Sequence, residues 1–291
     1  MRASREDHEG PVPALLTSPV SRRGALVLLG GLGLAVAGCS GGNDSNSATA
    51  TTKGASSSST TSTTTGATTT TGAATATVTD CSVIPEETGG PYPGDGSNGP
   101  DVLSENGVVR KDIRSSFDGL SGTAEGVPYT ISFTVVNVDN GCKPLTGAAV
   151  YVWHCDRDGN YSMYSQGATD QNYLRGVQEV DANGVASFTS IFPACYSGRW
   201  PHVHFEVYPS VDAATSGSNK LATSQIAIPK DACDAVYATS GYEQSVSNLS
   251  RVSLASDMVF SDGVATETPS MTGNATNGYM SSLVVGVSGA V

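Results

Sequence analysis

The feature that most constrains the fold is a series of short segments in which apolar and polar residues alternate, separated by Gly, Pro, Asn and Asp. Residues 131–135 follow this pattern, and so do residues 185–191, which come directly after a turn sequence at 181–184. Further segments of strand-like composition cover residues 149–153, 203–208, 224–228 and 279–287. Alternation with a period of two predicts strands, and no segment has a long amphipathic helical period. We therefore expect an all-β domain, an antiparallel β-sandwich or barrel.

The N-terminal segment predicts export. Arg22 and Arg23 precede an apolar run at 25–37 that is too short to span a bilayer. The run leads into Val-Ala-Gly-Cys, ending at Cys39, which is similar to a bacterial lipoprotein cleavage site. We expect residues 1–38 to be a twin-arginine-type lipoprotein signal peptide, with an ordinary signal peptide as the alternative. The exported protein would be lipid-anchored to the outer side of the bacterial cytoplasmic membrane or to the cell surface.

The segment that follows Cys39 has a biased composition. Residues 40–79 are almost entirely Ser, Thr, Ala and Gly. Such a tract cannot bury a core, so we expect residues 39–80 to comprise the lipidated cysteine and a disordered stalk. The composition changes at Asp80-Cys81, and we expect residues 81–291 to form one folded domain.

The charge of the chain limits its partners. It has 27 acidic and 15 basic residues, which give a formal net charge of −12 at pH 7. An acidic surface repels nucleic-acid phosphates and anionic lipids. We therefore exclude nucleic acid as a partner and expect membrane contact only through the lipid on Cys39.

The remaining cysteines form an odd set. In an exported protein disulfides are expected, yet five cysteines remain after Cys39, so one thiol should stay free or pair between chains. Their pairing stays open. They are Cys81, Cys142, Cys155, Cys195 and Cys233.

Two histidines, His202 and His204, are separated by one residue in the strand-like segment. Alternate side chains of a strand share a face, so both imidazoles point the same way, together with Glu206 and Tyr208. The intervening valine and phenylalanine residues then point into a core. Two imidazoles on one strand face are a known metal-site geometry, but such pairs also arise by chance, so the pair alone does not establish a metal site.

Further motifs accompany the pair. V-W-H at 152–154 is followed by G-N-Y-S at 159–162, then I-F-P-A-C-Y at 191–196, and Arg199 lies three residues before His202. In this order the motifs resemble those of the intradiol ring-cleavage dioxygenases, the family of catechol 1,2-dioxygenase and protocatechuate 3,4-dioxygenase. The resemblance implies a catalytic domain with a β-sandwich and long loops around a metal site. It covers about residues 81–291 and includes E-T-G-G-P-Y at 87–92 and R-K-D-I at 110–113.

The resemblance implies a non-haem Fe(III) site. Its ligands would be the equatorial Tyr161 and His202 and the axial Tyr196 and His204. Phenolate is a hard donor that suits Fe(III). Tyrosine ionises at about pH 10 in water, so two tyrosinates at neutral pH require a bound metal.

The implied reaction cleaves a catechol-type aromatic diol between its two hydroxyl-bearing carbons, with O2 as co-substrate and a muconate-type diacid as product. Tyr196 would take up a proton from the diol. Arg199 would stabilise negative charge that develops on the substrate, and Gln225 would orient the reacting species. We expect loops at 96–107 and 163–175 to line the pocket. The identity of the diol and the oligomeric state stay open.

The sequence departs from the family pattern in two places. Residues 199–202 read R-W-P-H where the family has R-P-x-H, which leaves the pose of Arg199 open. The helical N-terminal region that cytosolic catechol dioxygenases use for dimer contacts is replaced by the expected signal and stalk.

Other interpretations stay open beside the dioxygenase. One is a metal-free surface binding module on a β-sandwich. Another is a zinc-dependent hydrolase that uses His202, His204 and a carboxylate such as Glu206, which would need neither tyrosine. We expect Glu206 otherwise to be solvated, His154 to be a hydrogen-bonded structural histidine and Trp153 to be a core residue.

Overall fold

The structure is a computed structural model that describes residue 78 and residues 81–289. All of these residues belong to one unit, Thr69–Val291. The expected signal peptide, the lipidation site Cys39 and nearly all of the expected stalk lie outside the described residues. Within the described part of the chain, no helix combines the length and apolar character needed to cross a membrane.

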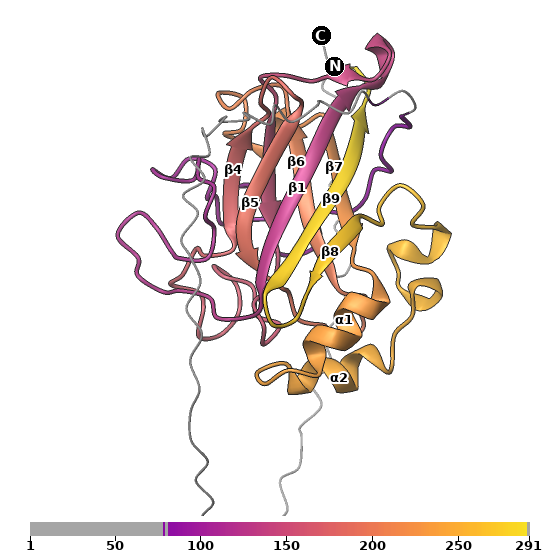
Figure 1. Cartoon of the computed structure of the whole chain (residues 1–291). Helices are drawn as coiled ribbons and strands as arrows, with labels where there is room; N and C mark the ends of the chain where they lie inside the picture. Colours follow the sequence, from indigo (N-terminus) through magenta and orange to yellow (C-terminus); the bar gives the residue numbers. More distant parts are fainter. Residues whose placement is uncertain (1–77, 79–80, 290–291) are drawn as a thin grey trace, which may run out of the picture. The chain divides into compact units, whose positions relative to one another are not determined.

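The first of two β-sheets has five strands (Figure 1). They are β1 (Pro128–Asn137), β2 (Lys143–Pro144), β5 (Val185–Ile191), β8 (Ser270–Asn274) and β9 (Gly278–Val287). The pairs of β1 with β2 and β5 and of β8 with β9 are antiparallel. The long strands β1 and β9 pair in parallel, which departs from the expected antiparallel sandwich. These are the first and last named strands, so no local sequence pattern relates them.

The second sheet has the strand order β4–β3–β6–β7 and is antiparallel throughout. Its strands are β3 (Ala149–Trp153), β4 (Arg175–Glu179), β6 (His202–Tyr208) and β7 (Ala222–Ala227). Because β6 lies between β3 and β7, its side chains have neighbours on both sides. This central position makes β6 a rigid support for any functional residue that it carries.

The main core consists of apolar side chains that alternate along the strands. From β1 it takes Tyr129, Ile131, Phe133 and Val135, and from β6 it takes Val203, Phe205 and Val207. The ring centroids of Phe133 and Phe205 lie 4.9 Å apart. Burial of each such side chain stabilises the fold by about 1.5–3 kcal/mol. The expectation that the apolar residues of β6 face a core is therefore confirmed.

A second hydrophobic cluster contains the strand side chains that point away from the main core. It combines strand residues Ala149, Tyr151, Trp153, Val177 and Tyr208 with loop residues that include Val102, Leu103, Val108, Tyr161 and Ala214. Loops rather than a third sheet supply its partners, and the histidines of β6 lie in the same phase as Tyr208.

Two short helices, α1 (Lys230–Tyr237) and α2 (Glu243–Leu249), follow β7 and lie toward one end of the sheets (Figure 1). Short 3-10 helices are η1 (Val138–Asn140), η2 (Gly217–Asn219), η3 (Leu254–Ser256) and η4 (Phe260–Asp262). The described residues are otherwise strands and loops. The all-β prediction is confirmed, and α1 and α2 are short exceptions to it.

The cysteine prediction was wrong in part. One disulfide, Cys81–Cys142, ties the segment before β1 to the turn after η1. Cys155, Cys195 and Cys233 are free and buried, where the sequence predicted a single free thiol. Burial raises the pKa of Cys195 to about 12, so its thiol stays protonated and behaves as a small apolar side chain.

Candidate metal centre

The two histidines lie on the central strand β6. His202 and His204 are each only 2% exposed. In the sheet, His204 is opposite Trp153 of β3 on one side and Gln225 of β7 on the other. The strand therefore fixes the position of both imidazoles, as the alternation in the sequence predicted.

The two tyrosines come from separate loops. Tyr161 lies between β3 and β4, and Tyr196 lies between β5 and β6. Gly159 lets these loops meet, because its φ is +88° and a Cβ there would lie 3.1 Å from Cβ of Tyr196. The rings of Tyr161 and Tyr196 are 5.8 Å apart. The glycine of the G-N-Y-S motif thus has a physical reason to precede Tyr161.

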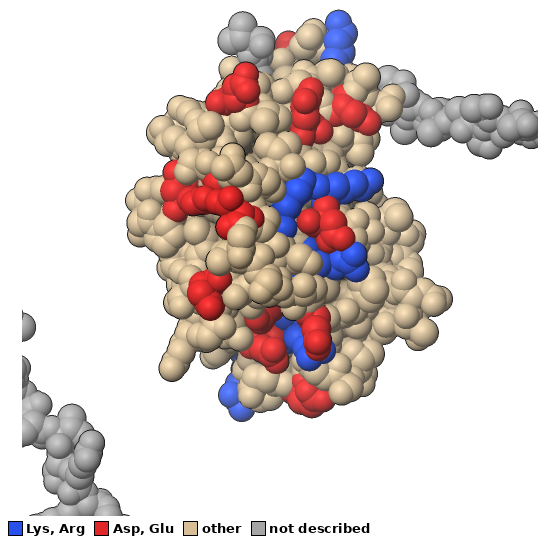
Figure 2. Space-filling view, turned by 90° about the vertical axis from the view of Figure 1, so that its left-hand side faces the viewer, with Lys and Arg blue, Asp and Glu red and all other residues tan. Residues whose placement is uncertain are grey.

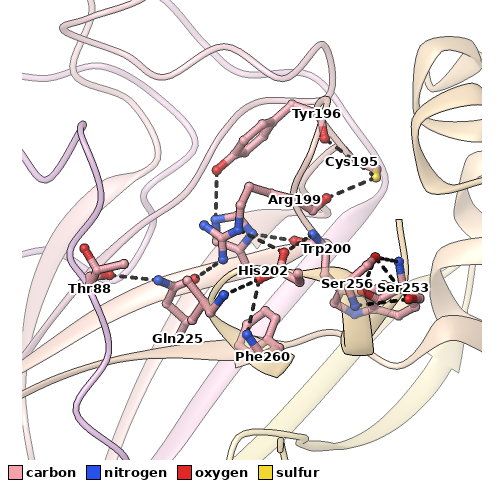
Figure 3. Close-up of polar contacts among 12 residues, drawn as sticks. Thr88, Cys195, Tyr196, Arg199, Trp200, His202, Gln225, Ser253, Ser256 and Phe260 are labelled. Atoms are coloured by element: carbon pink, nitrogen blue, oxygen red, sulfur yellow. Dashed lines mark hydrogen bonds and ion pairs between the residues drawn. The ribbon is translucent and has the colours of Figure 1, made fainter. Parts of the chain in front are cut away.

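The hydroxyl oxygens and Nε2 atoms of the four residues converge, and Figure 3 shows the contact between Tyr196 and His202. Tyr161 Oη lies 3.4 Å from Tyr196 Oη and 3.3 Å from His202 Nε2. His202 Nε2 lies 3.1 Å from both Tyr196 Oη and His204 Nε2. Donor atoms about 2.0–2.1 Å from one metal, at bond angles of about 90–120°, are roughly 2.8–3.6 Å apart. The observed distances fit one shared metal ion.

Burial sets the protonation of these donors. It lowers the pKa of His202 to about 3 and that of His204 well below the ordinary value. It raises the pKa of Tyr196 to about 12 and that of Tyr161 well above the ordinary value. The four side chains alone are therefore neutral at pH 7. A bound cation would supply the charge that phenolates need, and a set of phenolate oxygens and imidazole nitrogens suits Fe(III).

Arg199 and Gln225 lie beside His202 in a line of hydrogen bonds (Figure 3). Arg199 Nη2 donates to Gln225 Oε1 at 2.7 Å, and Gln225 Nε2 donates to the Thr88 carbonyl at 2.8 Å. Arg199 Nε donates to Asp257 Oδ2 at 2.9 Å. The arginine is thus fixed by a partner on either side, despite the shifted proline in its motif.

Asp257 is a functional neighbour that the sequence did not reveal. It is fully buried, and its Oδ2 also accepts a hydrogen bond of 2.6 Å from the Trp200 N–H. Burial opposes its ionisation, but the hydrogen bonds from Arg199 and Trp200 outweigh burial and hold the pKa of Asp257 below its usual value. The carboxylate therefore offsets part of the charge of Arg199.

The E-T-G-G-P-Y segment crosses the site. It contains Thr88, whose carbonyl accepts the hydrogen bond from Gln225 Nε2. A Cβ at Gly90 would lie 3.4 Å from His204 Cε1. The ring of Tyr92 packs 4.9 Å from that of Tyr161. This motif therefore covers two of the four donors.

The zinc-hydrolase interpretation is not supported by the position of Glu206. Its side chain is 0% exposed, accepts from Tyr208 Oη at 2.6 Å and accepts from Lys220 Nζ at 3.0 Å. The expectation that Glu206 is solvated was therefore wrong. Within the residues that the structure describes, no three His, Cys, Asp or Glu side chains are grouped to hold a metal.

The remaining candidates have other partners. His154 is a buried, hydrogen-bonded histidine, as predicted: Nδ1 donates to the Cys155 carbonyl and Nε2 accepts from Ser190 Oγ, each at 2.7 Å. Trp153 is fully buried, also as predicted. The tyrosines that could have been confused with the candidates bond elsewhere, namely Tyr164 to Gly94 and Asn98, Tyr173 to Asp156, and Tyr208 to Glu206.

The chain is similar to dioxygenases of known sequence. A family model described as "Dioxygenase" matches residues 98–232. The chain is 43% identical over 58 residues to chlorocatechol 1,2-dioxygenase from Rhodococcus opacus, which covers 20% of this chain and 23% of that protein. It is 42% identical over 76 residues to catechol 1,2-dioxygenase 2 from Acinetobacter lwoffii, which covers 26% of each. These matches support a relation of the chain to the intradiol ring-cleavage dioxygenase family.

The two sequence matches span only about a quarter of each curated relative. A solved structure, the intradiol ring-cleavage dioxygenase from Tetranychus urticae, has a TM-score of 0.56 and 24% identity. That match covers 72% of this chain and 95% of the other. It shows that the described domain has the fold of that dioxygenase.

Two residues reach the site from distant segments that no sequence motif marks. Asp257 lies 58 positions after Arg199, and no motif marks it. Phe260 of η4 lies with its ring 6.4 Å from that of His202 and 5.8 Å from the guanidinium of Arg199. Both follow α2 in a region without alternation, so only the tertiary fold identifies them.

Proposed function

We propose that this protein is a non-haem Fe(III) dioxygenase that cleaves a catechol-type diol between its hydroxyl-bearing carbons with O2, giving a muconate-type diacid. The observation that carries the proposal is the convergence of four side-chain donors, three of them buried and one partly buried, at distances of 3.1–3.4 Å. The sequence matches to dioxygenases support the same reaction class.

Tyr161, Tyr196, His202 and His204 would hold the iron. When bound, Fe(III) would act as a Lewis acid that favours ionisation of the diol and draws electron density from its ring. His202 is prepared for this role, because its Nδ1–H donates to the Trp200 carbonyl at 2.5 Å and leaves the Nε2 lone pair free.

The two tyrosines would have different roles. Tyr161 is 1% exposed, whereas Tyr196 is partly exposed. Tyr196 therefore has more freedom to move when a diol enters. As a phenolate it would accept a proton from the diol, and the high pKa of its phenol, about 12, would help it to retain that proton.

Arg199 and Gln225 would act on the substrate. The bonds from Arg199 to Asp257 and Gln225 hold the guanidinium in place before the substrate binds. A cation fixed in this way stabilises negative charge that develops during reaction without the cost of reorienting. Gln225 is itself fixed by the Thr88 carbonyl, so it would orient the reacting species rather than move with it.

The charge around Arg199 favours a diol whose side chain is not anionic. Asp257 offsets the arginine, and Glu87 lies close enough for its pKa to respond to Arg199 and Asp262 as well as to burial, which raises it most. Figure 2 shows acidic side chains spread over one face of the domain, with basic side chains mainly near its centre. Because Asp257 and Glu87 offset the charge of Arg199, we expect the site to favour a neutral diol over a carboxylated one.

Oxygen uptake by the purified, iron-loaded chain would test this proposal. We expect uptake with catechol or a neutral substituted catechol, with a diacid as product. The Tyr161→Phe variant serves as the matched control and should consume little oxygen. Absence of uptake with catechol and a broad panel of substituted diols would contradict the dioxygenase and favour the metal-free binding module.

Export is a separate proposal that the N-terminal sequence supports. We propose that the twin-arginine signal delivers the protein and that lipid on Cys39 anchors it outside the cytoplasmic membrane. Cells that produce the full chain should incorporate labelled fatty acid into the protein, and Cys39→Ala should abolish that label. Labelling that is unchanged in Cys39→Ala would contradict the anchor.

A further inference from the structure

The two imidazoles of the candidate metal centre are held in different ways. His202 Nδ1 donates to the Trp200 carbonyl at 2.5 Å. His204 Nδ1 is buried and has no hydrogen-bond partner among the described residues. Metal-binding histidines usually donate the second ring N–H to an acceptor, which fixes the ring and strengthens it as a donor. His204 therefore needs another support.

Trp153 supplies a contact of a different kind. Its ring lies 4.8 Å from that of His204, and the planes are inclined by only 3°, so the two rings are stacked. The two residues are opposite each other on β3 and β6, and Trp153 is fully buried. Trp153 Nε1 also lacks a hydrogen-bond partner among the described residues, so no hydrogen bond competes with stacking.

The stack continues away from the site. The ring of Tyr151 lies 5.0 Å from that of Trp153, at an angle of 21°. Tyr151 Oη donates to the Pro93 carbonyl at 2.7 Å and accepts from Arg175 Nη1 at 3.0 Å. Arg175 also donates to the Tyr92 carbonyl at 2.9 Å. Hydrogen bonds therefore anchor the far end of the three-ring stack to the segment that covers the site.

We propose that Trp153 is a positioning residue that holds His204 for the metal by stacking, in place of a hydrogen bond at Nδ1. The inference rests on the proposed iron site. Coordination to a cation makes an imidazole electron-poor, so its contact with the electron-rich indole face strengthens when the metal binds. Indole is the best such partner, phenyl is weaker and an aliphatic side chain is weakest.

Two substitutions and one control test the proposal in the full chain. Trp153→Leu removes the stack, and Trp153→Phe keeps a smaller aromatic ring. Phe188→Leu is the matched control, because Phe188 is fully buried on β5 in the main core and belongs to the other sheet. For each protein, thermal unfolding is measured without metal, and loss of iron to excess EDTA is followed by the visible absorption of the iron-loaded form.

We expect Trp153→Leu to lose iron at least about tenfold faster than the wild type, the range seen when the support of a metal ligand is removed. Trp153→Phe should lose it about threefold faster, because a weaker stack remains. Phe188→Leu should unfold at a lower temperature yet lose iron at the wild-type rate. If Trp153→Leu does not fold, Trp153→Phe and the control decide the question.

A wild-type rate of iron loss in the folded Trp153 variants would overturn the inference while leaving the dioxygenase proposal intact. Equal acceleration in Phe188→Leu and Trp153→Leu would also overturn it, because general destabilisation would then explain the loss. A wild-type protein that binds no iron would overturn the proposed function, and this inference with it.

Discussion

The two ends of β6 differ although their polar side chains share one strand and one face. At one end, Glu206 accepts hydrogen bonds from Tyr208 and Lys220 at 2.6 and 3.0 Å. At the other end, the nearest partners of the buried His202 and His204 include each other and the two tyrosine hydroxyls. Both ends are almost inaccessible to solvent.

The two ends show that burial alone does not identify a functional site. Glu206 accepts hydrogen bonds from two side chains of the protein, so it needs no bound group. The histidine end brings four potential metal donors together, and one of their ring nitrogens has no partner among the described residues. A buried donor set of this kind marks the place of a bound group more reliably than the number of polar residues does.

The largest expected effect comes from removing one tyrosine hydroxyl at each end of β6. Tyr161→Phe removes a proposed ligand, and Tyr208→Phe removes the donor to Glu206. We expect Tyr161→Phe to lower dioxygenase activity by at least about a thousandfold, because a metal site supplies several kcal/mol of stabilisation that depends on its ligands. Tyr208→Phe should retain activity. Steady-state oxygen uptake and iron content measure both.

Equal losses of activity in the two variants would contradict the proposal that only the histidine end binds a metal. The proposal would also be contradicted if Tyr161→Phe kept its iron and its activity. Thermal unfolding of each metal-free variant separates loss of the site from loss of the fold.

Glu267 is a third buried polar side chain, and it lies outside both ends of β6. It is fully buried, and neither carboxylate oxygen has a hydrogen-bond partner among the described residues. Burial, followed by the charges of Glu87 and Asp262, raises its pKa from 4.5 to about 8. The carboxyl of Glu267 therefore becomes neutral by keeping a proton, whereas the proposed ligands would bind a metal ion.

The raised pKa of Glu267 makes the stability of the fold depend on pH. Between about pH 4.5 and pH 8 the folded state keeps the proton of Glu267 and the unfolded state releases it, so stability falls as pH rises. We expect a loss of roughly 2–4 kcal/mol across this window from Glu267. Urea unfolding of the metal-free protein at both ends of the window measures it. A Glu267→Gln variant with the same pH dependence would contradict the assignment.

Loss of the hydrogen bond from Tyr208 to Glu206 should have a smaller effect, on the stability of the fold. Tyr208→Phe leaves a buried carboxylate with one donor, Lys220. We expect the free energy of unfolding to fall by about 1–3 kcal/mol, the typical cost of an unsatisfied buried acceptor. Urea unfolding at constant pH is the measurement, with Tyr164→Phe at a less buried hydrogen bond as the comparison. No difference between the two variants would show that the Glu206 contacts contribute little.

The smallest expected effect concerns the charge of the substrate. The positive charge of Arg199 is offset by Asp257, with Glu87 nearby. We expect kcat/KM for 4-methylcatechol to exceed that for 3,4-dihydroxybenzoate by about tenfold, which corresponds to about 1.4 kcal/mol. Glu87→Gln should narrow the ratio. A preference for the carboxylated diol would contradict this part of the proposal.

Much of the fold could be predicted because the strands that form it have local patterns. Residues 149–153 and 185–191 were expected as strands and are β3 and β5. β4, Arg-Gly-Val-Gln-Glu, was missed because it has few apolar residues. The polar β8, Ser270–Asn274, was missed for the same reason, since its partner β9 rather than its own sequence makes it a strand.

Some residues of the candidate site could be predicted from the sequence, and others could not. Alternation placed His202 and His204 on one face, and the order of motifs selected Tyr161 and Tyr196, which the structure brings next to them. The contact of Arg199 with Asp257 was not predictable, because it joins segments that share no pattern. Nor was the stacking of Trp153 on His204, since strand register decides it.

The most direct test of the proposed metal centre is the visible absorption spectrum of the purified full chain after loading with iron. Two tyrosinates bound to one Fe(III) should give a burgundy charge-transfer band at a stoichiometry of about one iron per chain, and Tyr161→Phe should weaken or shift that band. A colourless iron-loaded protein, or a band that is unchanged in both Tyr161→Phe and Tyr196→Phe, would contradict the proposed metal centre.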